Sequence, residues 1–161
     1  MIKLRLADDS RRQWLEMIAR IEALAQPTAE QVEPIQQVIR AGFAFNFARE
    51  MGDDAPWAAL TPFTVRERRR LGYPGEHPIL FRSGSYHDSF VDEGHARHIS
   101  EWDASGGLWT VAEGSSDPRA EELEFGRWDM AGRPVTLLGE SGEQRIETVL
   151  DEMFGGWFEE E

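Results

Sequence analysis

The sequence predicts an α+β protein in which helices come first, a small and mostly antiparallel sheet follows, and a C-terminal helix closes the fold. Three observations support this order. Apolar residues recur at helical spacing up to about residue 52, short apolar runs separated by turn residues follow Phe90, and helical spacing returns near residue 141. A chain of 161 residues can bury a sizeable core. We therefore expect a single domain over residues 1–154 and a short acidic tail over residues 155–161.

The first helix is predicted to follow the cap candidates at residues 8–10, because aspartate and serine side chains accept hydrogen bonds from the first free N–H groups of a helix. Its apolar positions, including Trp14, Ile18 and Ile21, recur at helical spacing. The pattern ends near Pro27, where we expect the helix to stop.

The second helix carries the strongest periodic signal in the sequence. Thr28 followed by Gln31 has the spacing of a capping box, and an apolar stripe continues from there to Gly52. Pro34 lies inside the pattern. The helix therefore either kinks at this proline or begins near Glu33 with the proline in its first turn.

A short basic helix is expected next. Thr61 and Pro62 form a plausible cap and first helical residue, and the helix is predicted to run through Arg70. Four of its residues are arginines. Glycines and prolines then indicate a loop over residues 72–78, which leads to the apolar run at residues 79–81.

The second half of the chain is predicted to form paired strands and one more helix. Short apolar runs at residues 99–102, 108–112 and 123–125 are separated by Gly, Ser, Asp and Pro, which favours strands. The closing helix is expected from about Ser141 to Phe154, where two glycines stop it.

Charge is distributed unevenly along the chain. The net charge is -13, but up to Gly75 there are 11 Lys and Arg against 10 acids, and beyond it 6 against 20. The acidic second half disfavours adhesive binding to nucleic acid, which needs clustered cations. No apolar stretch has the length of a membrane span and no signal peptide is evident, so we expect no membrane partner. There is no cysteine, which excludes disulfides and thiolate chemistry.

A search for catalytic groups yields little. The nearest set to a metal site is Glu93, His95, His98 and Glu101, because imidazole and carboxylate groups bind zinc and similar ions. Gly94 argues against a helix that would bring the two histidines together. No nucleophile elbow, Walker loop or dinucleotide fingerprint is present. We therefore expect a non-enzymatic protein with no catalytic residues, no metal and no cofactor.

An ordered series of residues carries a family resemblance. It consists of Trp57, Leu60, Thr61 and Thr64, the basic helix, Ile79-Leu80 with Ser83-Gly84 and Ser89, then Phe125-Gly126, Arg133-Pro134 and Leu138-Gly139. This series resembles the phage virion morphogenesis family, the tail completion proteins of Mu-like and P2-like phages, over roughly residues 35–154. Two positions depart from the family pattern: Tyr86 stands where Leu is usual, and Leu123 where a His is frequent.

The resemblance implies a structural virion protein for tail completion or head–tail joining. It would form a homo-oligomeric ring, with six copies as the number that similar tail proteins suggest, at the head-proximal end of the tail or neck around the DNA channel. The implied partners are the tail tube, the tail terminator and the neck or connector proteins, with DNA passing through unbound. The implied location is the virion, with the host cytoplasm as the site of assembly.

Two groups of residues are predicted to serve such a ring. One is the set of interface candidates: Trp57, Leu60, Thr64, Arg66, Arg68, Arg69, Arg70, Trp128 and Trp157. Aromatic and arginine side chains contribute much of the binding energy at interfaces, and the basic helix of one copy could meet the acidic face of its neighbour. Trp128 and Trp157 could equally cap the core of their own chain, and the arginines could form an ordinary solvated face.

The other group is the set of channel-facing candidates: Glu113, Asp117, Glu121, Glu122 and Glu124. Carboxylates lining a channel would repel DNA phosphates over roughly 8 to 10 Å at physiological salt. Three alternatives to tail completion remain open from the sequence: a tail terminator, a small metal-dependent enzyme built on the His95 cluster, and an acidic adaptor that mimics DNA.

Overall fold

The computed structural model describes residues 8–52, 54–105, 108–127 and 130–154. Its elements, in chain order, are α1 (Asp8–Ala25), α2 (Ala29–Arg49), β1 (Met51–Gly52), β2 (Ala55–Pro56), α3 (Pro62–Arg70), α4 (Ser85–Val91), β3 (His98–Asp103), β4 (Thr110–Ser115), α5 (Ala120–Phe125), β5 (Gly126–Arg127), β6 (Met130–Ala131) and α6 (Gly139–Phe154). The order of the elements confirms the predicted α+β class, with helices first, antiparallel strands later and a closing helix.

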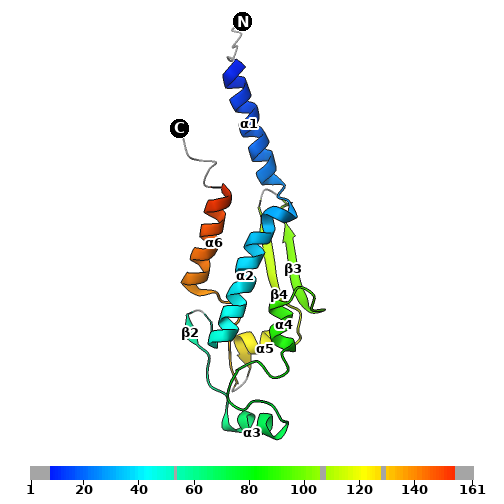
Figure 1. Ribbon diagram of the computed structural model, residues 1–161, viewed down its shortest axis with the longest axis vertical. Coiled ribbons are helices and arrows are strands. Elements are labelled where there is room, and N and C mark those ends of the chain that lie inside the picture. The colour runs from blue at the N-terminus through cyan, green and yellow to red at the C-terminus, as the bar shows by residue number, and fades with distance from the viewer. Residues whose placement is uncertain (1–7, 53, 106–107, 128–129, 155–161) are drawn as a thin grey trace.

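Helix α2 is the spine of the molecule. It lies between α6 on one side and the β3–β4 hairpin on the other, and α4 packs against its second half (Figure 1). The capping box is present, since Thr28 Oγ1 accepts from the Gln31 N–H at 3.4 Å and Gln31 Oε1 accepts from the Thr28 N–H at 2.9 Å. The helix begins at Ala29, so Pro34 lies inside it and does not start it.

The strands form three separate two-stranded antiparallel sheets. The longest pair is β3 with β4, in which Ile99 lies opposite Gly114 and Trp102 opposite Val111. This pairing confirms strands at the first two predicted runs. The third prediction was wrong, because residues 123–125 belong to helix α5.

An aromatic cluster forms the core at the point where α2, α4 and the 133–138 segment meet. Phe47 is central, with its ring in edge contact with Trp57 at 5.9 Å and with Phe90 at 5.9 Å between centroids. Such edge-to-face pairs stabilise cores beyond simple burial. The buried members are Phe43, Phe47, Trp57, Ile79, Tyr86, Phe90 and Val135.

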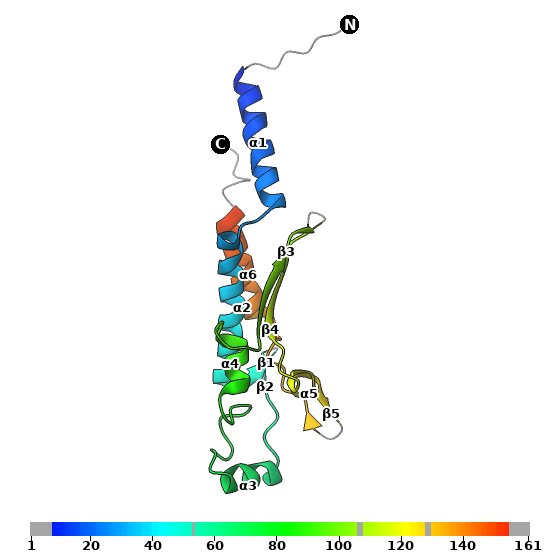
Figure 2. The same ribbon diagram turned by 90° about the vertical axis from the view of Figure 1, so that its right-hand side faces the viewer.

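The molecule is elongated, with different elements at its two ends. Helix α1 projects from one end and α3 lies at the other, in both views (Figures 1 and 2). The body between them contains the core, the hairpin and α6. The two ends are therefore separate surfaces, and each is available to a different neighbour.

Candidate assembly surfaces

The residues that carry the family resemblance hold one another in place. Trp57 Nε1 donates to the Pro134 carbonyl at 2.9 Å, and the Arg133 guanidinium donates to the carbonyls of Ala58 and Ala59 at 2.9 and 3.2 Å. These bonds join segments that lie more than 70 positions apart in the sequence. Trp57 is only 7% exposed. It is therefore a core residue, which corrects its prediction as an interface residue.

Leu60 and Thr64 have local structural roles. Leu60 is partly buried against the core, and the Thr64 N–H donates to Thr61 Oγ1 at 3.2 Å, which caps α3 as predicted. Pro62 occupies the first turn, where no backbone donor is needed. The cap sets where α3 begins and so fixes the direction of its arginines. Whether Leu60 and Thr64 also contact a partner stays a prediction.

The four arginines of α3 divide into one interior and three surface residues. Arg68 is 7% exposed, and its Nη2 donates to the carbonyls of Pro78 and Phe81 at 2.9 and 3.2 Å. Burial lowers the pKa of this guanidinium from its usual value. Arg68 is thus a clamp for the following loop, which corrects its prediction as an interface residue. Arg66, Arg69 and Arg70 are exposed.

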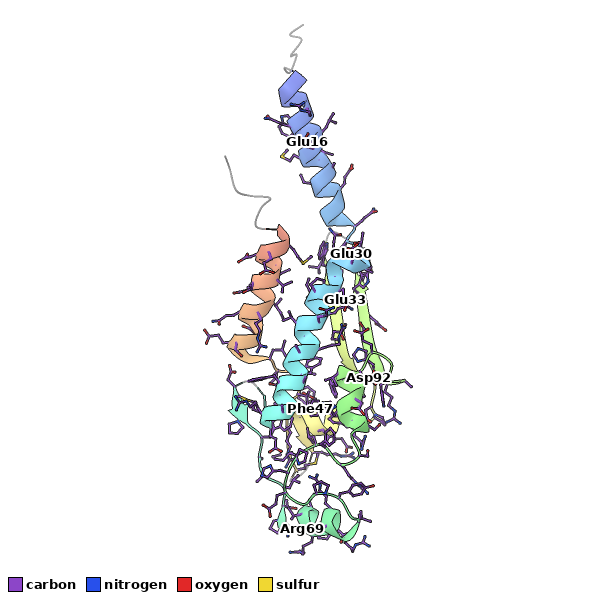
Figure 3. All side chains as sticks on the ribbon, in the orientation of Figure 1. Glu16, Glu30, Glu33, Phe47, Arg69 and Asp92 are labelled. Carbon is purple, nitrogen blue, oxygen red and sulfur yellow. The ribbon has the colours of Figure 1, made fainter. Side chains whose placement is uncertain are left out.

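The surface arginines differ in how far they are already paired. Arg69 Nη2 lies 3.1 Å from Glu76 Oε1, and Arg70 Nη2 lies 2.8 Å from Glu67 Oε2. Within the part of the chain that the structure describes, Arg66 forms neither a salt bridge nor a hydrogen bond. Figure 3 shows Arg69 on α3 at the end of the molecule opposite Glu16 of α1.

A cleft of about 390 Å³ lies beside this helix. The apolar part of its lining, which we call the floor, includes Leu60, Val65 and Ile79, and the exposed Arg66 and Arg69 also line it. The remaining lining residues are Ala59, Pro62, Glu76 and His77. An apolar floor with cations at the rim suits a ligand that is apolar and acidic. Sequence reasoning named the arginines but did not place them at a cleft.

The cleft wall is fixed to the end of α2 through Glu50. The Ile79 N–H donates to Glu50 Oε1 at 2.7 Å, and His77 Nδ1 lies 2.5 Å from Glu50 Oε2. Glu50 itself adopts φ 54 as the C-cap of α2. One carboxylate therefore holds the loop against the helix end and keeps the cleft open beside α3.

Three of the five channel-facing candidates lie inside the molecule, which corrects their prediction as channel-lining groups. The Glu113 and Asp117 side chains are 0% exposed, and Glu124 is 8% exposed. Interior carboxylates need partners because desolvation penalises an unpaired charge. Each of the three has such partners within this chain.

Two of these carboxylates are held by arginines. Glu113 Oε1 lies 3.0 Å from Arg40 Nη1 and accepts from Ser100 Oγ at 2.6 Å. Asp117 Oδ2 lies 2.7 Å from both Arg97 Nη1 and Arg119 Nη2. Hydrogen bonds from Arg119, together with that from Arg97, hold the pKa of Asp117 well below its usual range. The third, Glu124, accepts from the Val135 and Thr136 N–H groups.

The remaining acidic surface lies elsewhere. Glu121 is exposed, and Glu122 forms an ion pair with Arg127. Helix α6 is richer in exposed carboxylates, with five exposed acids against one arginine. Those acids are Glu140, Glu143, Glu147, Asp151 and Glu152, and the arginine is Arg145. Of these exposed carboxylates, Glu121 alone is among the channel-facing candidates, and its place at a channel stays a prediction.

Helix α1 presents an apolar face to solvent. Trp14, Leu15, Met17, Ile18 and Ile21 are between 42 and 57% exposed. They fall on one side of a helix that makes no extensive contact with any other described element. The sequence pattern identified the helix but gave no sign that its apolar face would be uncovered.

The histidines of the suggested metal set have separate partners. His95 Nε2 lies 3.3 Å from Ser85 Oγ, whereas His98 Nδ1 lies 3.2 Å from the Ser89 carbonyl. Glu93 pairs with Arg40 at 2.6 Å. Among the residues that the structure describes, no three His, Asp or Glu side chains are arranged to hold a metal ion.

Two interface candidates, Trp128 and Trp157, lie outside the described residues. None of the described helices has the length and apolar content to cross a membrane.

The chain matches no protein-family model, no curated protein and no solved structure at a significant level.

Proposed function

We propose that this chain is a non-enzymatic structural protein of a phage particle, one that completes the tail or joins it to the head as a homo-oligomeric ring around the DNA channel. The observation that carries the proposal is the uncovered apolar face of α1. A helix that projects from the body with five large apolar side chains exposed is suited to contact with another subunit.

The binding free energy that burial of the α1 face can supply is too small for a stable complex, so assembly needs further contacts. Burying a large apolar side chain contributes roughly 1.5–3 kcal/mol, and about half of each of the five remains to be buried. The face therefore supplies roughly 4–7 kcal/mol, below the roughly 8.2 kcal/mol of a micromolar complex. A ring, in which each subunit has two neighbours, supplies the additional contacts.

Residues of the ordered series meet in the packing of this chain. Trp57, Arg133 and Pro134, which stand far apart in the ordered series, are joined by hydrogen bonds around one core. Gly126 and Gly139, which complete two pairs of the series, adopt φ values of 77 and 63, where glycine is favoured. These residues therefore have structural roles within this chain.

The charge distribution supports a ring through which DNA passes. The exposed carboxylates of α6 repel phosphates at ranges near the Debye length, roughly 8 Å at physiological salt. The basic α3 lies at the other end of the molecule from α1 (Figure 2). Cyclic assembly requires two different complementary patches on each subunit, and these two ends are different.

Cryo-electron microscopy of particles made from the genome that encodes this chain tests the proposal. We expect a ring of this chain between head and tail, with α6 towards the channel. A preparation from the same genome with this reading frame interrupted serves as the control and should lack the ring density. Purified particles that do not contain the chain, although the producing cells do, would overturn the proposal.

A further inference from the structure

The cleft beside α3 and the acidic tail of the same chain are complementary. The cleft lining combines the apolar Leu60, Val65 and Ile79 with two exposed arginines, Arg66 and Arg69. Residues 155–161 read Gly-Gly-Trp-Phe-Glu-Glu-Glu, which combines two adjacent aromatic residues with three glutamates and no cation. An aromatic side chain can cover the floor while neighbouring carboxylates meet the arginines.

We infer that the α3 cleft binds residues 155–161 of a second copy of this chain. Trp157 and Phe158 cover the apolar floor, and the following glutamates pair with Arg66 and Arg69. The inference rests on the proposed ring only in naming the second copy as the neighbouring subunit. It assigns a role to the tail and to the basic helix together.

The free cation at the cleft edge is Arg66. It is exposed and has no ion-pair partner among the described residues, so an incoming carboxylate meets an unsatisfied guanidinium there. Arg69 is shared, because Glu76 already lies 3.1 Å from it. A tail glutamate at Arg69 must therefore compete with Glu76, and Arg66 is the position where the charge contact should contribute most.

The size of the cleft is also suitable. Its volume of about 390 Å³ falls within the range of roughly 300–1,000 Å³ that is usual for ligand-binding clefts. Val65 and Ile79 are 8 and 3% exposed, so the floor is part of the packed interior and keeps its shape. One aromatic side chain, with part of a second, is an occupant of matching chemistry.

The tail cannot reach the cleft of its own chain. Helix α6 has 16 residues and runs for about 24 Å away from its start at Gly139. The seven residues of the tail span at most about 25 Å when fully extended, so they could return only to the level of Gly139. Helix α3 lies well beyond that level, at the far end of the body (Figure 1). The occupant must therefore come from another copy.

Such a contact is heterologous, since the tail region of one subunit meets the α3 cleft of the next. Heterologous contacts generate rings when the rotation closes. The charges agree with this direction: residues 139–161 contain eight acids and one arginine, whereas α3 contains four arginines and one glutamate.

A peptide of residues 152–161 carrying a fluorescent label tests the inference when it is titrated with the full chain and followed by anisotropy. We expect saturable binding that weakens with salt. Arg66→Glu should weaken binding at least tenfold, whereas Arg70→Glu should change it less than threefold, because Arg70 carries the same charge on the same helix but does not line the cleft. Both sites are exposed, and matching thermal unfolding curves would confirm that both variants fold.

Three outcomes would overturn the inference: no binding of the peptide to the full chain, equal weakening by the two charge reversals, or equal binding of a peptide in which Trp157 and Phe158 are both alanine. The result is separable from the fate of the proposed function. Peptide binding by a chain that is absent from particles would remove the phage role alone, whereas a ring in particles without peptide binding would remove this contact alone.

Discussion

Replacement of Glu124 tests whether this carboxylate supports the fold from inside the subunit. Its oxygens accept from the Val135 N–H at 2.9 and 3.0 Å, and one of them also accepts from the N–H and the hydroxyl of Thr136 at 3.3 and 3.0 Å. Val135 is 0% exposed, so water cannot replace a lost acceptor there. Glu124→Gln keeps the shape but turns one acceptor oxygen into a donor.

The expected cost follows from these bonds. Hydrogen bonds to a charged acceptor contribute roughly 1.5–3 kcal/mol each, and a buried donor without a partner costs roughly 1–3 kcal/mol. We therefore expect Glu124→Gln to lower the free energy of unfolding by about 2–4 kcal/mol, measured by urea denaturation at neutral pH with tryptophan fluorescence. Glu124→Ala should lower it further, because all of these bonds are lost and a cavity remains.

The control is Glu121→Gln, an identical change at an exposed position of the same helix, α5. It should alter the free energy of unfolding by less than about 0.5 kcal/mol. Equal effects of the two substitutions would refute the reasoning, because they would mean that Glu124 behaves as a surface carboxylate. The channel-facing interpretation of Glu124 would then stand again.

Three further predictions address the α2 cap, the acid response and the α1 face. Thr28→Ala removes the oxygen that accepts from the Gln31 N–H and should cost about 1 kcal/mol in urea denaturation, whereas Thr28→Ser should cost much less; equal losses would contradict a capping role. Hydrogen bonds from Arg119 and Arg97 hold the folded pKa of Asp117 below its usual value of 3.8, so Asp117 stabilises the fold above pH 3.8 and this contribution is lost as pH falls towards the folded pKa. Asp117→Asn should therefore flatten the decline in stability below about pH 4, and an unchanged slope would count against the ion pairs. Ile18→Glu combined with Ile21→Glu should leave the unfolding free energy within about 0.5 kcal/mol, since both side chains are largely exposed, but should reduce incorporation into particles; normal incorporation would argue against α1 as a contact surface.

The helix ends could be predicted because their signals are local. Thr28 and Gln31 lie three residues apart, and Thr61 directly precedes Pro62, so each cap is contained in a few consecutive residues. The run at residues 123–125 misled because a short apolar run fits a strand or a helix equally well. In the structure Asp117 turns the chain by accepting from the Arg119 N–H, and helix α5 begins at the next residue.

The interior charges could not be predicted, because their partners are distant in the sequence. Arg40 and Glu113 are 73 positions apart, and nothing local in either segment shows that they meet. The sequence therefore predicts that the carboxylates of this acidic segment face a channel, whereas the side chains of Glu113 and Asp117 are fully buried. Helix α4 was missed for a related reason: its seven residues are too few to show a helical period.

The placement of charge constrains how such subunits would come together. Two copies with a net charge of -13 repel each other over the Debye length, which is roughly 30 Å at 0.01 M salt and roughly 8 Å at 0.15 M. The proposed attraction at the α3 cleft acts only at contact, between the lining residues Arg66 and Arg69 and the tail carboxylates of a second copy. Two copies that repel each other at long range and attract each other only at this contact associate in one orientation and not at random. Because the α1 face supplies only roughly 4–7 kcal/mol, it should not hold two free subunits together without a second contact. Assembly should therefore require both contacts at once, as a closing ring on a partner surface provides.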